Sequence, residues 1–600
     1  MKLFKIILNF LVVCVSAQSF PYDRAWGTYV GGTGTLLDHY YIEGNSFFTD
    51  SQNSIYVNGN TGFQSGYTSA YYSQFAPGGT LPDTSLNSSN YSAKFSSNGQ
   101  MLTGSYENDI NTTMYNRLLG IDGNDSKYIL SMKPGIVLNL ATSGVWLSQP
   151  TNISETKTYT LSKYDANQNL LWTTYLPNSE GENFSLRFDE NDNVFLLGYT
   201  NEQITNVGSS GTFQENFIPY SVSGTTYGNS YIVKLNAAGQ KTWGTYSLTG
   251  ITDLAYYNDA LYFIVVYRPQ MPGNFATAGT FQPSLQANQM IIKLNAVTGT
   301  QIWGTYYASS NSNTYTGLGM SDIEVNETGV YLCGFTEDTA NPAYYATAGA
   351  FKTQLTGDGD MFLTKFTHDG NRTWSTYFGS DGYEFWLGAT PLTILGNRII
   401  FAGNQFGNTN NISTPGAFLT TIPNAGNWSM FFTEFDSSGN RLWTSYYGGQ
   451  GSNFLGEYIH PELLNDGSLI LWGSTGAASG IATVNGAYPT MLNPALQQPF
   501  GFIAKFTIKG LSVEDLTKTG TLQLYDNPNN GIFTVEGDIL KKKDFDLKIF
   551  DFSGRLLYTE KMKKDTRQTF SYQGRLQTGT YSVQISAGKE LSKSFKMIVK

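Results

Sequence analysis

The sequence has few cysteines, few histidines and few charged residues. It holds 2 Cys and 3 His in 600 residues, and only 14% of its residues are charged. The sequence therefore has too few Cys and His residues for more than a small catalytic or metal-binding cluster of these types. Beyond the first 17 residues no apolar run reaches the roughly 18 residues that a membrane-spanning helix needs. We therefore expect no transmembrane segment in the mature chain.

Basic residues are also in the minority, with 36 Lys and Arg against 46 Asp and Glu. Their distribution is uneven, because residues 521–600 hold 14 basic and 9 acidic residues while the remainder holds 22 and 37. This contrast indicates a compositional boundary near residue 520. The acidic body lacks the clustered basic residues that neutralise phosphates, so we expect no nucleic-acid partner.

The first 17 residues read as a signal peptide for secretion. Two lysines precede an apolar run from Ile6 to Val15, and small residues follow at Ser16 and Ala17. A lipoprotein alternative would use Cys14, but Val13 stands where a small residue is expected. Cleavage before Gln18 removes Cys14 and leaves Cys333 alone, which excludes a disulfide within the mature chain.

Aromatic residues and glycines are abundant, with 40 Tyr, 38 Phe and 64 Gly, a composition that favours strands and tight turns. One aromatic phrase recurs in forms such as AWGTYVGG, IWGTYY and LWTSYYGG. Its tryptophans are Trp26, Trp172, Trp243, Trp303, Trp374 and Trp443. A seventh copy has Leu102 in place of Trp, and the successive spacings of 60 to 76 residues indicate seven structural repeats.

Each repeat contains four strand-like runs, joined by two tight turns and one long central loop. The third run forms a second marker, SAKF, LSKY, IVKL, IIKL, LTKF, FTEF and IAKF, which also occurs seven times. Four antiparallel strands per repeat are typical of a β-propeller blade. The sequence therefore predicts an all-β fold: a seven-bladed β-propeller, followed by a small C-terminal β-sandwich.

The order of the runs predicts how the ring closes. The chain opens with a fourth-strand phrase at Trp26, and its last repeat ends with a third strand at Phe506. We therefore expect the N-terminal strand to complete the last blade and to remove open sheet edges. The predicted organisation is a signal peptide at 1–17, a propeller at 18–508, a linker at 509–520 and a sandwich at 521–600.

The repeated tryptophans are interpreted as packing residues between blades, because a buried Trp covers about 150–250 Å². The lysines of the third runs have apolar neighbours on both sides. We interpret them as structural residues with buried stems and paired ammonium groups rather than as a basic binding site. They are Lys94, Lys163, Lys234, Lys293, Lys365 and Lys505.

Residues 24 to 508 resemble a known family, the bacterial seven-bladed propeller repeats. Its consensus runs roughly W-S-T-Y-x-G-G, then I-A-V-D-x-x-G-N-V-Y-V-T-G-Y-T, then G-A-F. Here LRFDENDNVFLLGYT and IEVNETGVYLCGFT carry the middle section, and GTFQ, GAFK and GAFL carry the last. The resemblance implies the fold and is nearly silent on activity, because propellers host many unrelated functions.

The C-terminal 80 residues are similar to the type A sorting domain of the type IX secretion route found in Bacteroidota. The resemblance implies secretion through that machinery, localisation at the outer-membrane surface or outside the cell, and removal of the tail. One departure is Asp526, where the family usually has Pro. The matching motif residues are Asn527, Pro528, Asn529, Gly531, Gly554, Arg555, Gly579, Tyr581 and Lys600.

The long loops of all repeats are expected on one face of the ring, the long-loop face. Tyr71, Tyr72, Tyr344 and Tyr345 stand there among small polar residues. Exposed tyrosines suit stacking on sugar rings or binding to a protein. The alternative is that these rings pack against their own loops.

A metal or acid/base site is a further hypothesis. Asp38 and His39 precede the innermost strand of the first blade, and Glu457 and His460 lie near the corresponding point of the last blade. Closure makes these blades neighbours, so the four side chains could meet at the channel mouth. Acids at the equivalent loops, Glu182, Asp253 and Glu384, could instead accept hydrogen bonds from turn amides.

No catalytic residue or organic cofactor is predicted. DGNDS from Asp122 and TGDGD from Thr356 suggest calcium loops, but neither has the full ligand series. The leading interpretation is a secreted, surface-displayed module that binds a glycan or a protein. The alternatives are a propeller hydrolase or lyase acting on extracellular polysaccharide, and a structural component of the cell surface or of a gliding apparatus.

Overall fold

The computed structural model describes residues 20–600, apart from eighteen short stretches. These stretches are 38–45, 64–66, 109–114, 152–156, 178–183, 223–224, 248–249, 267–274, 285–288, 309–318, 386–389, 408–410, 450–456, 492–497, 510–521, 542–543, 552–554 and 588–590. The described residues form antiparallel sheets throughout, with one short α-helix, α1 (Ser69–Tyr72), and the 3-10 helices η1 (Ser73–Phe75) and η5 (Asp538–Lys541). The all-β prediction is confirmed.

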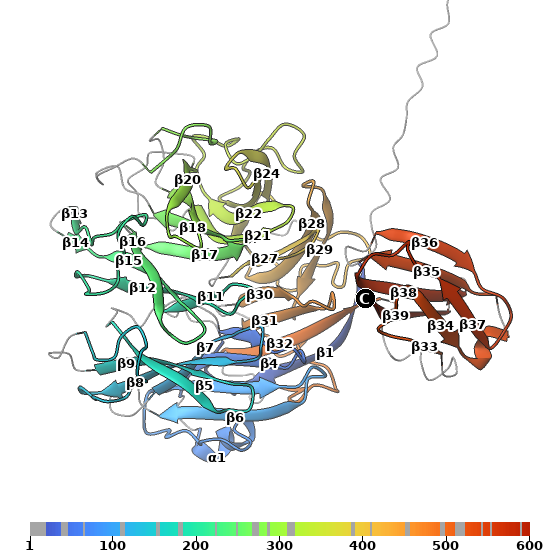
Figure 1. The fold of residues 1–600 in the computed structure, drawn as a ribbon, viewed down its shortest axis with the longest axis horizontal. Helices are drawn as coiled ribbons and strands as arrows, with labels where there is room; N and C mark the ends of the chain where they lie inside the picture. The colour runs from blue at the N-terminus through green and yellow to red at the C-terminus, as the bar shows by residue number, and fades with distance from the viewer. Residues whose placement is uncertain are drawn as a thin grey trace, which may run out of the picture.

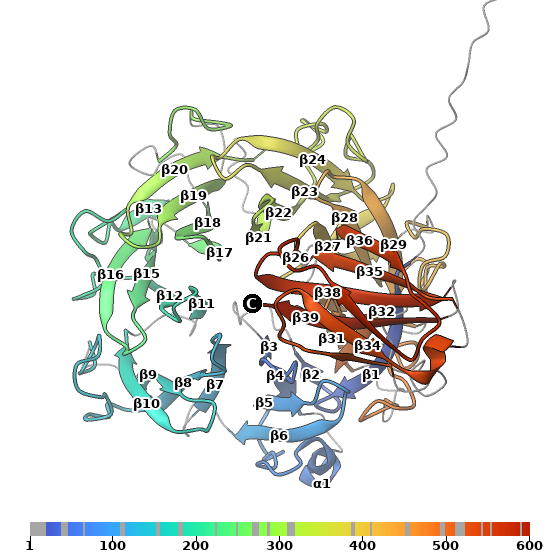
Figure 2. The same ribbon diagram turned by 45° about the vertical axis from the view of Figure 1, so that its right-hand side comes forward.

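Seven of the described sheets follow one another around a ring as the blades of a propeller (Figures 1 and 2). Blade 1 comprises β2 (Thr35–Leu36), β3 (Phe47–Thr49), β4 (Ile55–Gly62), β5 (Ser88–Phe95) and β6 (Met101–Asn108). Blade 2 comprises β7 (Tyr115–Ile121), β8 (Lys127–Pro134), β9 (Lys157–Tyr164) and β10 (Leu170–Leu176). Blade 3 comprises β11 (Ser185–Phe188), β12 (Val194–Thr200), β15 (Asn229–Leu235) and β16 (Lys241–Ser247), with the small hairpin β13 (Tyr220–Val222) and β14 (Thr225–Tyr227) in its long loop.

The remaining blades repeat this order from the channel outward. Blade 4 comprises β17 (Ile251–Tyr257), β18 (Ala260–Val266), β19 (Gln289–Asn295) and β20 (Gln301–Tyr306), and blade 5 comprises β21 (Gly319–Asn326), β22 (Gly329–Thr336), β23 (Asp360–Phe366) and β24 (Arg372–Phe378). Blade 6 comprises β25 (Tyr383–Phe385), β26 (Leu392–Leu395), β27 (Arg398–Phe406), β28 (Ser429–Asp436) and β29 (Arg441–Tyr447). Blade 7 comprises β30 (Tyr458–Leu463), β31 (Leu469–Thr475), β32 (Phe500–Ile508) and the N-terminal strand β1 (Tyr22–Val30).

The ring closes as the sequence predicts. Strand β1 pairs antiparallel with β32, in a register that runs from Tyr22 opposite Ile508 to Val30 opposite Gly501. Trp26, Tyr29 and Val30 of β1 are buried. The N-terminal strand therefore supplies the outermost strand of the last blade.

The repeated tryptophan links five of the seven blades to the next one. The copy in blade 1 has no Trp, and the register of its strands places Thr103, rather than the expected Leu102, at the Trp position, because Thr103 pairs with Lys94 as Trp243 pairs with Lys234. The indole Nε1 of Trp243 in blade 3 donates to the carbonyl oxygen of Ala296 in blade 4 at 3.0 Å, and that of Trp303 donates to His368 in blade 5 at 2.8 Å. The acceptors lie in the tight turn between the third and fourth strands of the following blade. The same contact occurs from Trp26 to Ser97, Trp172 to Ala237 and Trp374 to Ser437, whereas Trp443 donates to Glu434 of its own blade.

A glycine in that turn leaves the space that the indole ring occupies. At Gly299, with φ of 72°, a Cβ atom would lie 2.8 Å from the Trp243 ring, and at Gly239 one would lie 2.8 Å from the Trp172 ring. Only glycine combines this left-handed conformation with so close an approach. We call the set of Trp, turn carbonyl and turn glycine the interblade latch.

The lysines of the third strands join the interblade latch. The Nζ atoms of Lys234, Lys293 and Lys365 donate to the same turn carbonyls that accept from the tryptophans, at 3.2, 3.1 and 3.0 Å. Lys163 and Lys234 also form ion pairs of 2.9 and 3.0 Å with aspartates of their own blades. The predicted pairing of these ammonium groups is confirmed.

The long loops run back along the outer edge of each blade. In blade 4, Thr277 N donates to Gly304 O at 2.9 Å and Tyr306 N donates to Gln282 O at 3.1 Å. Gln282 N donates to the Thr305 hydroxyl at 2.9 Å. The corresponding Tyr N to loop carbonyl bonds are Tyr29 to Tyr488, Tyr106 to Thr80, Tyr175 to Leu147, Tyr246 to Gln214, Tyr377 to Lys352 and Tyr446 to Leu419.

This loop contact accounts for the rest of the repeated phrase. A Cβ atom at Gly304 would lie 2.2 Å from the carbonyl oxygen of Phe275, so the glycine permits the loop to approach. The following Thr accepts a loop amide, and the Tyr amide donates to a loop carbonyl. The outer strand edges, which would otherwise be open to aggregation, are thereby covered.

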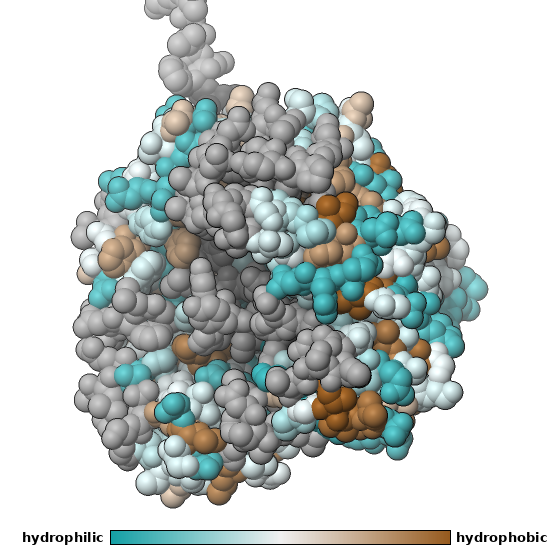
Figure 3. Space-filling model, turned by 90° about the vertical axis from the view of Figure 1, so that its left-hand side faces the viewer, coloured by the Kyte–Doolittle hydropathy of each residue, from teal (hydrophilic) through white to brown (hydrophobic). Residues whose placement is uncertain are grey.

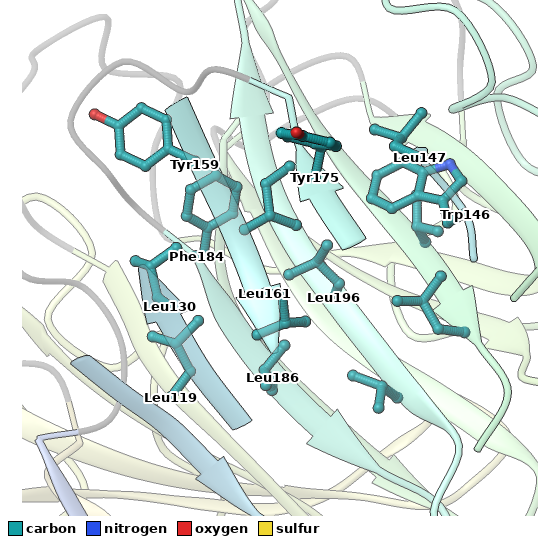
Figure 4. Packing of buried hydrophobic residues seen from close by; sticks show 14 of the residues in the cluster. Leu119, Leu130, Trp146, Leu147, Tyr159, Leu161, Tyr175, Phe184, Leu186 and Leu196 are labelled. Carbon is teal, nitrogen blue, oxygen red and sulfur yellow. The ribbon is translucent and has the colours of Figure 1, made fainter. Parts of the chain in front are cut away.

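Hydrophobic clusters lie between neighbouring blades. The largest joins blades 2 and 3 and includes Tyr128, Leu161, Trp172, Leu196 and Tyr231 (Figure 4 shows part of it). Further clusters among the described residues join blades 3 and 4, 4 and 5, 5 and 6, 6 and 7, and 7 and 1. Cys333 is a free thiol in the cluster of blades 5 and 6, and burial raises its pKa well above the usual range.

The C-terminal residues form two further sheets that share one hydrophobic cluster. One sheet has the order β33 (Gln523–Tyr525), β34 (Ile532–Glu536), β37 (Arg567–Ser571). The other has the order β36 (Leu556–Lys561), β35 (Asp546–Asp551), β38 (Gly579–Ala587), β39 (Leu591–Val599). The predicted small β-sandwich is therefore present.

Candidate functional site

The four predicted ligand-face tyrosines lie in the long loops, but two of them are buried. Tyr72 donates its hydroxyl to Thr33 O at 3.1 Å, and Tyr345 stacks on Phe362 with ring centroids 3.9 Å apart. Burial removes both rings from contact with a ligand, because they serve the packing of their own blades. Tyr72 and Tyr345 are therefore corrected from candidate ligand contacts to packing residues.

Tyr71 and Tyr344 are half-buried. The Tyr71 hydroxyl accepts from Thr33 N at 3.2 Å, and the Tyr344 hydroxyl donates to the Gln282 side chain at 2.8 Å. Figure 3 views the molecule from the side on which β13 and β14 lie, and its described surface is hydrophilic with separate hydrophobic patches.

Two members of the predicted metal cluster are described, and both are engaged in the fold. His460 is buried and stacks on Trp472 with ring centroids 4.4 Å apart, and its Nδ1 lies 3.2 Å from Thr390 O. Buried Glu457 accepts from the Thr475 hydroxyl at 3.0 Å. Asp38 and His39 lie outside the described residues, so their approach to His460 stays a prediction. Within the described residues no three His, Cys, Asp or Glu side chains are grouped as metal ligands.

In the two suggested calcium loops, the described aspartates Asp122 and Asp360 bind backbone amides and lysines of the protein. Asp122 accepts from Ser126 N at 2.9 Å and pairs with Lys163. After Thr356, Asp360 accepts from the Thr356 amide at 2.9 Å and from Lys352 Nζ at 2.7 Å. Both carboxylates thus stabilise turns.

Asp253 and Glu384 also accept hydrogen bonds from backbone amides, from Ile323 N and from Ser380 N, both at 2.9 Å. Ser380 lies in the turn between β24 and β25, so the interpretation as an acceptor for turn amides is confirmed for Glu384. Ile323 lies in β21 of the next blade, so Asp253 accepts instead from a strand amide across the junction of blades 4 and 5. Glu182 lies outside the described residues.

A group of charged residues on the innermost strands was not found from the sequence. Arg187 of β11 pairs with Asp253 of β17 at 2.9 Å. Burial and the neighbouring Asp253 carboxylate raise the pKa of Glu324 in β21. Burial raises the pKa of Glu462 in β30 to about 7, against the attraction of Arg187. These four half-buried groups come from the innermost strands of blades 3, 4, 5 and 7, which lie around the centre of the ring (Figure 2).

The raised pKa of Glu462 predicts that the stability of the protein depends on pH. Its pKa rises from 4.5 to about 7 on folding, so the folded state holds a proton that the unfolded chain releases between these values. Stability contributed by this proton is complete below pH 4.5 and is lost as pH rises through 7. Glu462→Gln is uncharged throughout and should stabilise the protein at pH 8 by about 1–3 kcal/mol, with no gain near pH 4.5.

Thermal unfolding of Glu462→Gln and of the native chain at the two pH values measures this difference. Glu202→Gln is the matched control, because Glu202 is exposed in a long loop. Equal gains for Glu462→Gln at both pH values would contradict the interpretation.

The sorting-motif residues cluster where the two C-terminal sheets meet the end of the chain. Asn529 donates its amide to Ile598 O at 2.9 Å, and its carbonyl accepts from Lys600 N at 2.8 Å. Its side chain accepts from Gly531 N at 2.8 Å, and Gly531 has φ of 90°. The Asn527–Pro528 peptide, which is cis, precedes this contact. The motif therefore joins the start of the sandwich to its last strand.

Two further motif residues hold local turns. Arg555 donates to Asp551 at 3.0 Å, and the Tyr581 hydroxyl donates to Gln577 O at 2.8 Å. Gly579 is the first residue of β38, and Gly554 lies outside the described residues.

These features define a closed seven-bladed propeller that carries a C-terminal β-sandwich. The sandwich matches the family described as Secretion system C-terminal sorting domain over residues 523–600. This domain directs export by the type IX secretion system, so the chain interacts with that machinery and is secreted or displayed at the cell surface. Among the described residues no helix is both long and apolar enough to cross a membrane.

Similar solved structures include an acylaminoacyl peptidase of Pyrococcus horikoshii. The match has 8% identity and a TM-score of 0.35, and it covers 85% of this chain and 59% of the peptidase. The match to BamB of Moraxella catarrhalis has 9% identity and a TM-score of 0.22, and it covers 73% of this chain and 91% of BamB. The match to a europium-containing methanol dehydrogenase has 10% identity and a TM-score of 0.33, and it covers 81% of this chain and 93% of the dehydrogenase. This chain thus spans 59% of the length of the peptidase. No curated protein matches the sequence.

Proposed function

We propose that the propeller belongs to the bacterial seven-bladed repeats and acts outside the cell as a binding module for a glycan or a protein. The observation that carries this proposal is the use of the repeated residues. The Trp, Thr and Tyr of the phrase hold blades and loops together, and five of the six tryptophans contact the next blade. The residues that recur from blade to blade therefore stabilise the ring.

Recognition is then left to residues that differ between blades. These are concentrated in the loops between second and third strands and between successive blades, which emerge on the long-loop face. Half-buried Tyr71 and Tyr344 lie in these loops. Variable loops on a rigid scaffold are the usual place for binding residues.

Binding of the purified full-length chain to an array of bacterial and plant polysaccharides, and to immobilised extracellular proteins, tests the proposal. Saturable binding to one class of ligand supports it. The absence of saturable binding to either class would overturn it and would favour a structural role at the cell surface or in gliding.

A hydrolase or lyase is the second candidate, and the carboxyl groups of Glu324 and Glu462 favour it. Their raised pKa values supply carboxylic acids that stay protonated near neutral pH, as general-acid catalysis requires. Release of reducing ends from polysaccharide by the native chain, lost in Glu462→Gln, would support this candidate. Unchanged turnover in that variant would contradict it.

A further inference from the structure

The junction between blades 1 and 2 differs from the other six junctions. Each of the other six holds a hydrophobic cluster, and no described cluster joins blade 1 to blade 2. The interblade latch is absent there, as it is between blades 6 and 7, where Trp443 donates within its own blade. Thr103, which pairs with Lys94 as Trp243 pairs with Lys234, stands at the Trp position and is exposed, and Gln168, with φ of 68°, stands at the turn position that is elsewhere glycine.

The side of blade 1 that faces blade 2 is polar. In β5, Tyr91, Ala93 and Phe95 are buried in the cluster shared with blade 7. Side chains alternate across a strand, so Asn90, Ser92 and Lys94 face blade 2, and all three are only half-buried.

The side of blade 2 that faces blade 1 is also mostly polar. In β8, Tyr128, Leu130 and Met132 are buried against blade 3, while Lys127, Ile129 and Ser131 face blade 1 and are half-buried. Apart from Ile129, the side chains that meet at this junction in these two strands are polar. We call this junction the polar seam.

Polar contacts cross the polar seam. Asn58 Nδ2 donates to Leu118 O at 2.9 Å, and Asn116 N donates to Glu107 Oε2 at 2.7 Å. Lys127 Nζ lies 5.1 Å from the centre of the Tyr56 ring. The blades are therefore held together by hydrogen bonds and a cation–π contact rather than by an apolar core.

A pocket lies within the polar seam, and its enclosed part has space for about one water molecule. It lies toward the long-loop end of the seam, because Glu107 stands next to the end of β6 and Asn116 next to the start of β7. It has one carboxyl and one guanidinium among amides and hydroxyls. Its polar lining comprises Ser46, Asn58, Asn90, Ser92, Glu107, Asn116 and Arg117.

We propose that the polar seam is the binding site of an oligosaccharide, an inference that rests on the proposed binding function. Side-chain amides, hydroxyls, one carboxyl and one guanidinium complement the hydroxyl groups of sugars, which both donate and accept hydrogen bonds. The enclosed space admits one hydroxyl-sized group, so a sugar places one hydroxyl in the pocket while the rest of the chain lies along the seam.

The test uses the full-length chain, a glycan array and calorimetry with the best-binding oligosaccharide. Asn90→Ala and Glu107→Gln should each raise Kd at least tenfold, with an unchanged unfolding temperature. Asn98→Ala is the matched control, because it removes the same side chain from the exposed turn at the other end of blade 1 and should leave Kd unchanged. Ser92→Val replaces a seam hydroxyl with a strand-favouring apolar group and should also weaken binding without loss of stability.

The outcomes separate this inference from the proposed function. If the native chain binds an oligosaccharide and the seam variants bind it equally well, the seam site is overturned and the binding function stands. If the chain binds only proteins, the seam site is again overturned and the binding function stands. If it binds neither, both are overturned.

Discussion

Deletion of residues 18–31 is expected to abolish the cooperative unfolding of the propeller. The deletion removes β1, whose register with β32 closes blade 7. It also removes Tyr22, Trp26 and Tyr29, all buried. Truncation of one large buried residue typically costs about 2–5 kcal/mol, and a domain has only about 5–15 kcal/mol of stability. The loss therefore exceeds what the ring can tolerate.

The exposed edge of β32 adds a second expected consequence. Without β1 its backbone amides and carbonyls are unpaired, and such an edge favours association with other chains. Calorimetry should show no transition for the ring, and size-exclusion chromatography should show aggregates. A monomer with the native unfolding temperature would refute the closure argument.

A peptide of residues 18–31 gives a complementary measurement. Added to the shortened chain, it should restore the transition as its concentration rises, because binding to the folded state stabilises that state by mass action. A peptide of the same composition in scrambled order is the control. Restoration by both peptides would show that sequence-specific pairing is not the cause.

The fold could be predicted from the sequence because each repeat contains the same pattern of strand-forming and turn-forming residues. The aromatic phrase and the third-strand lysine count the blades independently, and the starting phrase at Trp26 specifies the closure. The course of the long loops could not be predicted. Their attachment depends on amides, such as Gln282 N, that bond to the outer strand whatever their side chain.

The candidate sites were less accessible from the sequence, because they depend on contacts between distant residues. Arg187 and Asp253 stand 66 residues apart and meet only because innermost strands surround one channel. Tyr72 and Tyr345 look like their half-buried neighbours Tyr71 and Tyr344, and only the packed loops distinguish them. The polar seam had one signal, the copy of the phrase that lacks Trp and has Thr103 at that position, but this signal does not reveal the polar surfaces of the two blades.

Trp243→Ala is expected to destabilise the ring by about 3–5 kcal/mol. The substitution removes a side chain that is 4% exposed, its hydrogen bond to Ala296 O and its packing on Gly299 of the next blade. Thr103→Ala is the matched control, since Thr103 pairs with Lys94 as Trp243 pairs with Lys234 and is exposed. It should cost no more than about 0.5 kcal/mol. Chemical denaturation of the three proteins measures both values.

A double-mutant cycle isolates the contact between the two blades. Gly299→Ala alone should be strongly destabilising, because its Cβ would lie 2.8 Å from the indole and its φ is 72°. In the Trp243→Ala background the steric cost due to the indole should disappear, while the contact with the Thr212 methyl group at 3.0 Å and the cost of the left-handed conformation should remain. Additive losses would mean that the indole and the turn do not act together. Because the same contact recurs at four other junctions, a coupled result at this one would account for the repetition of the aromatic phrase.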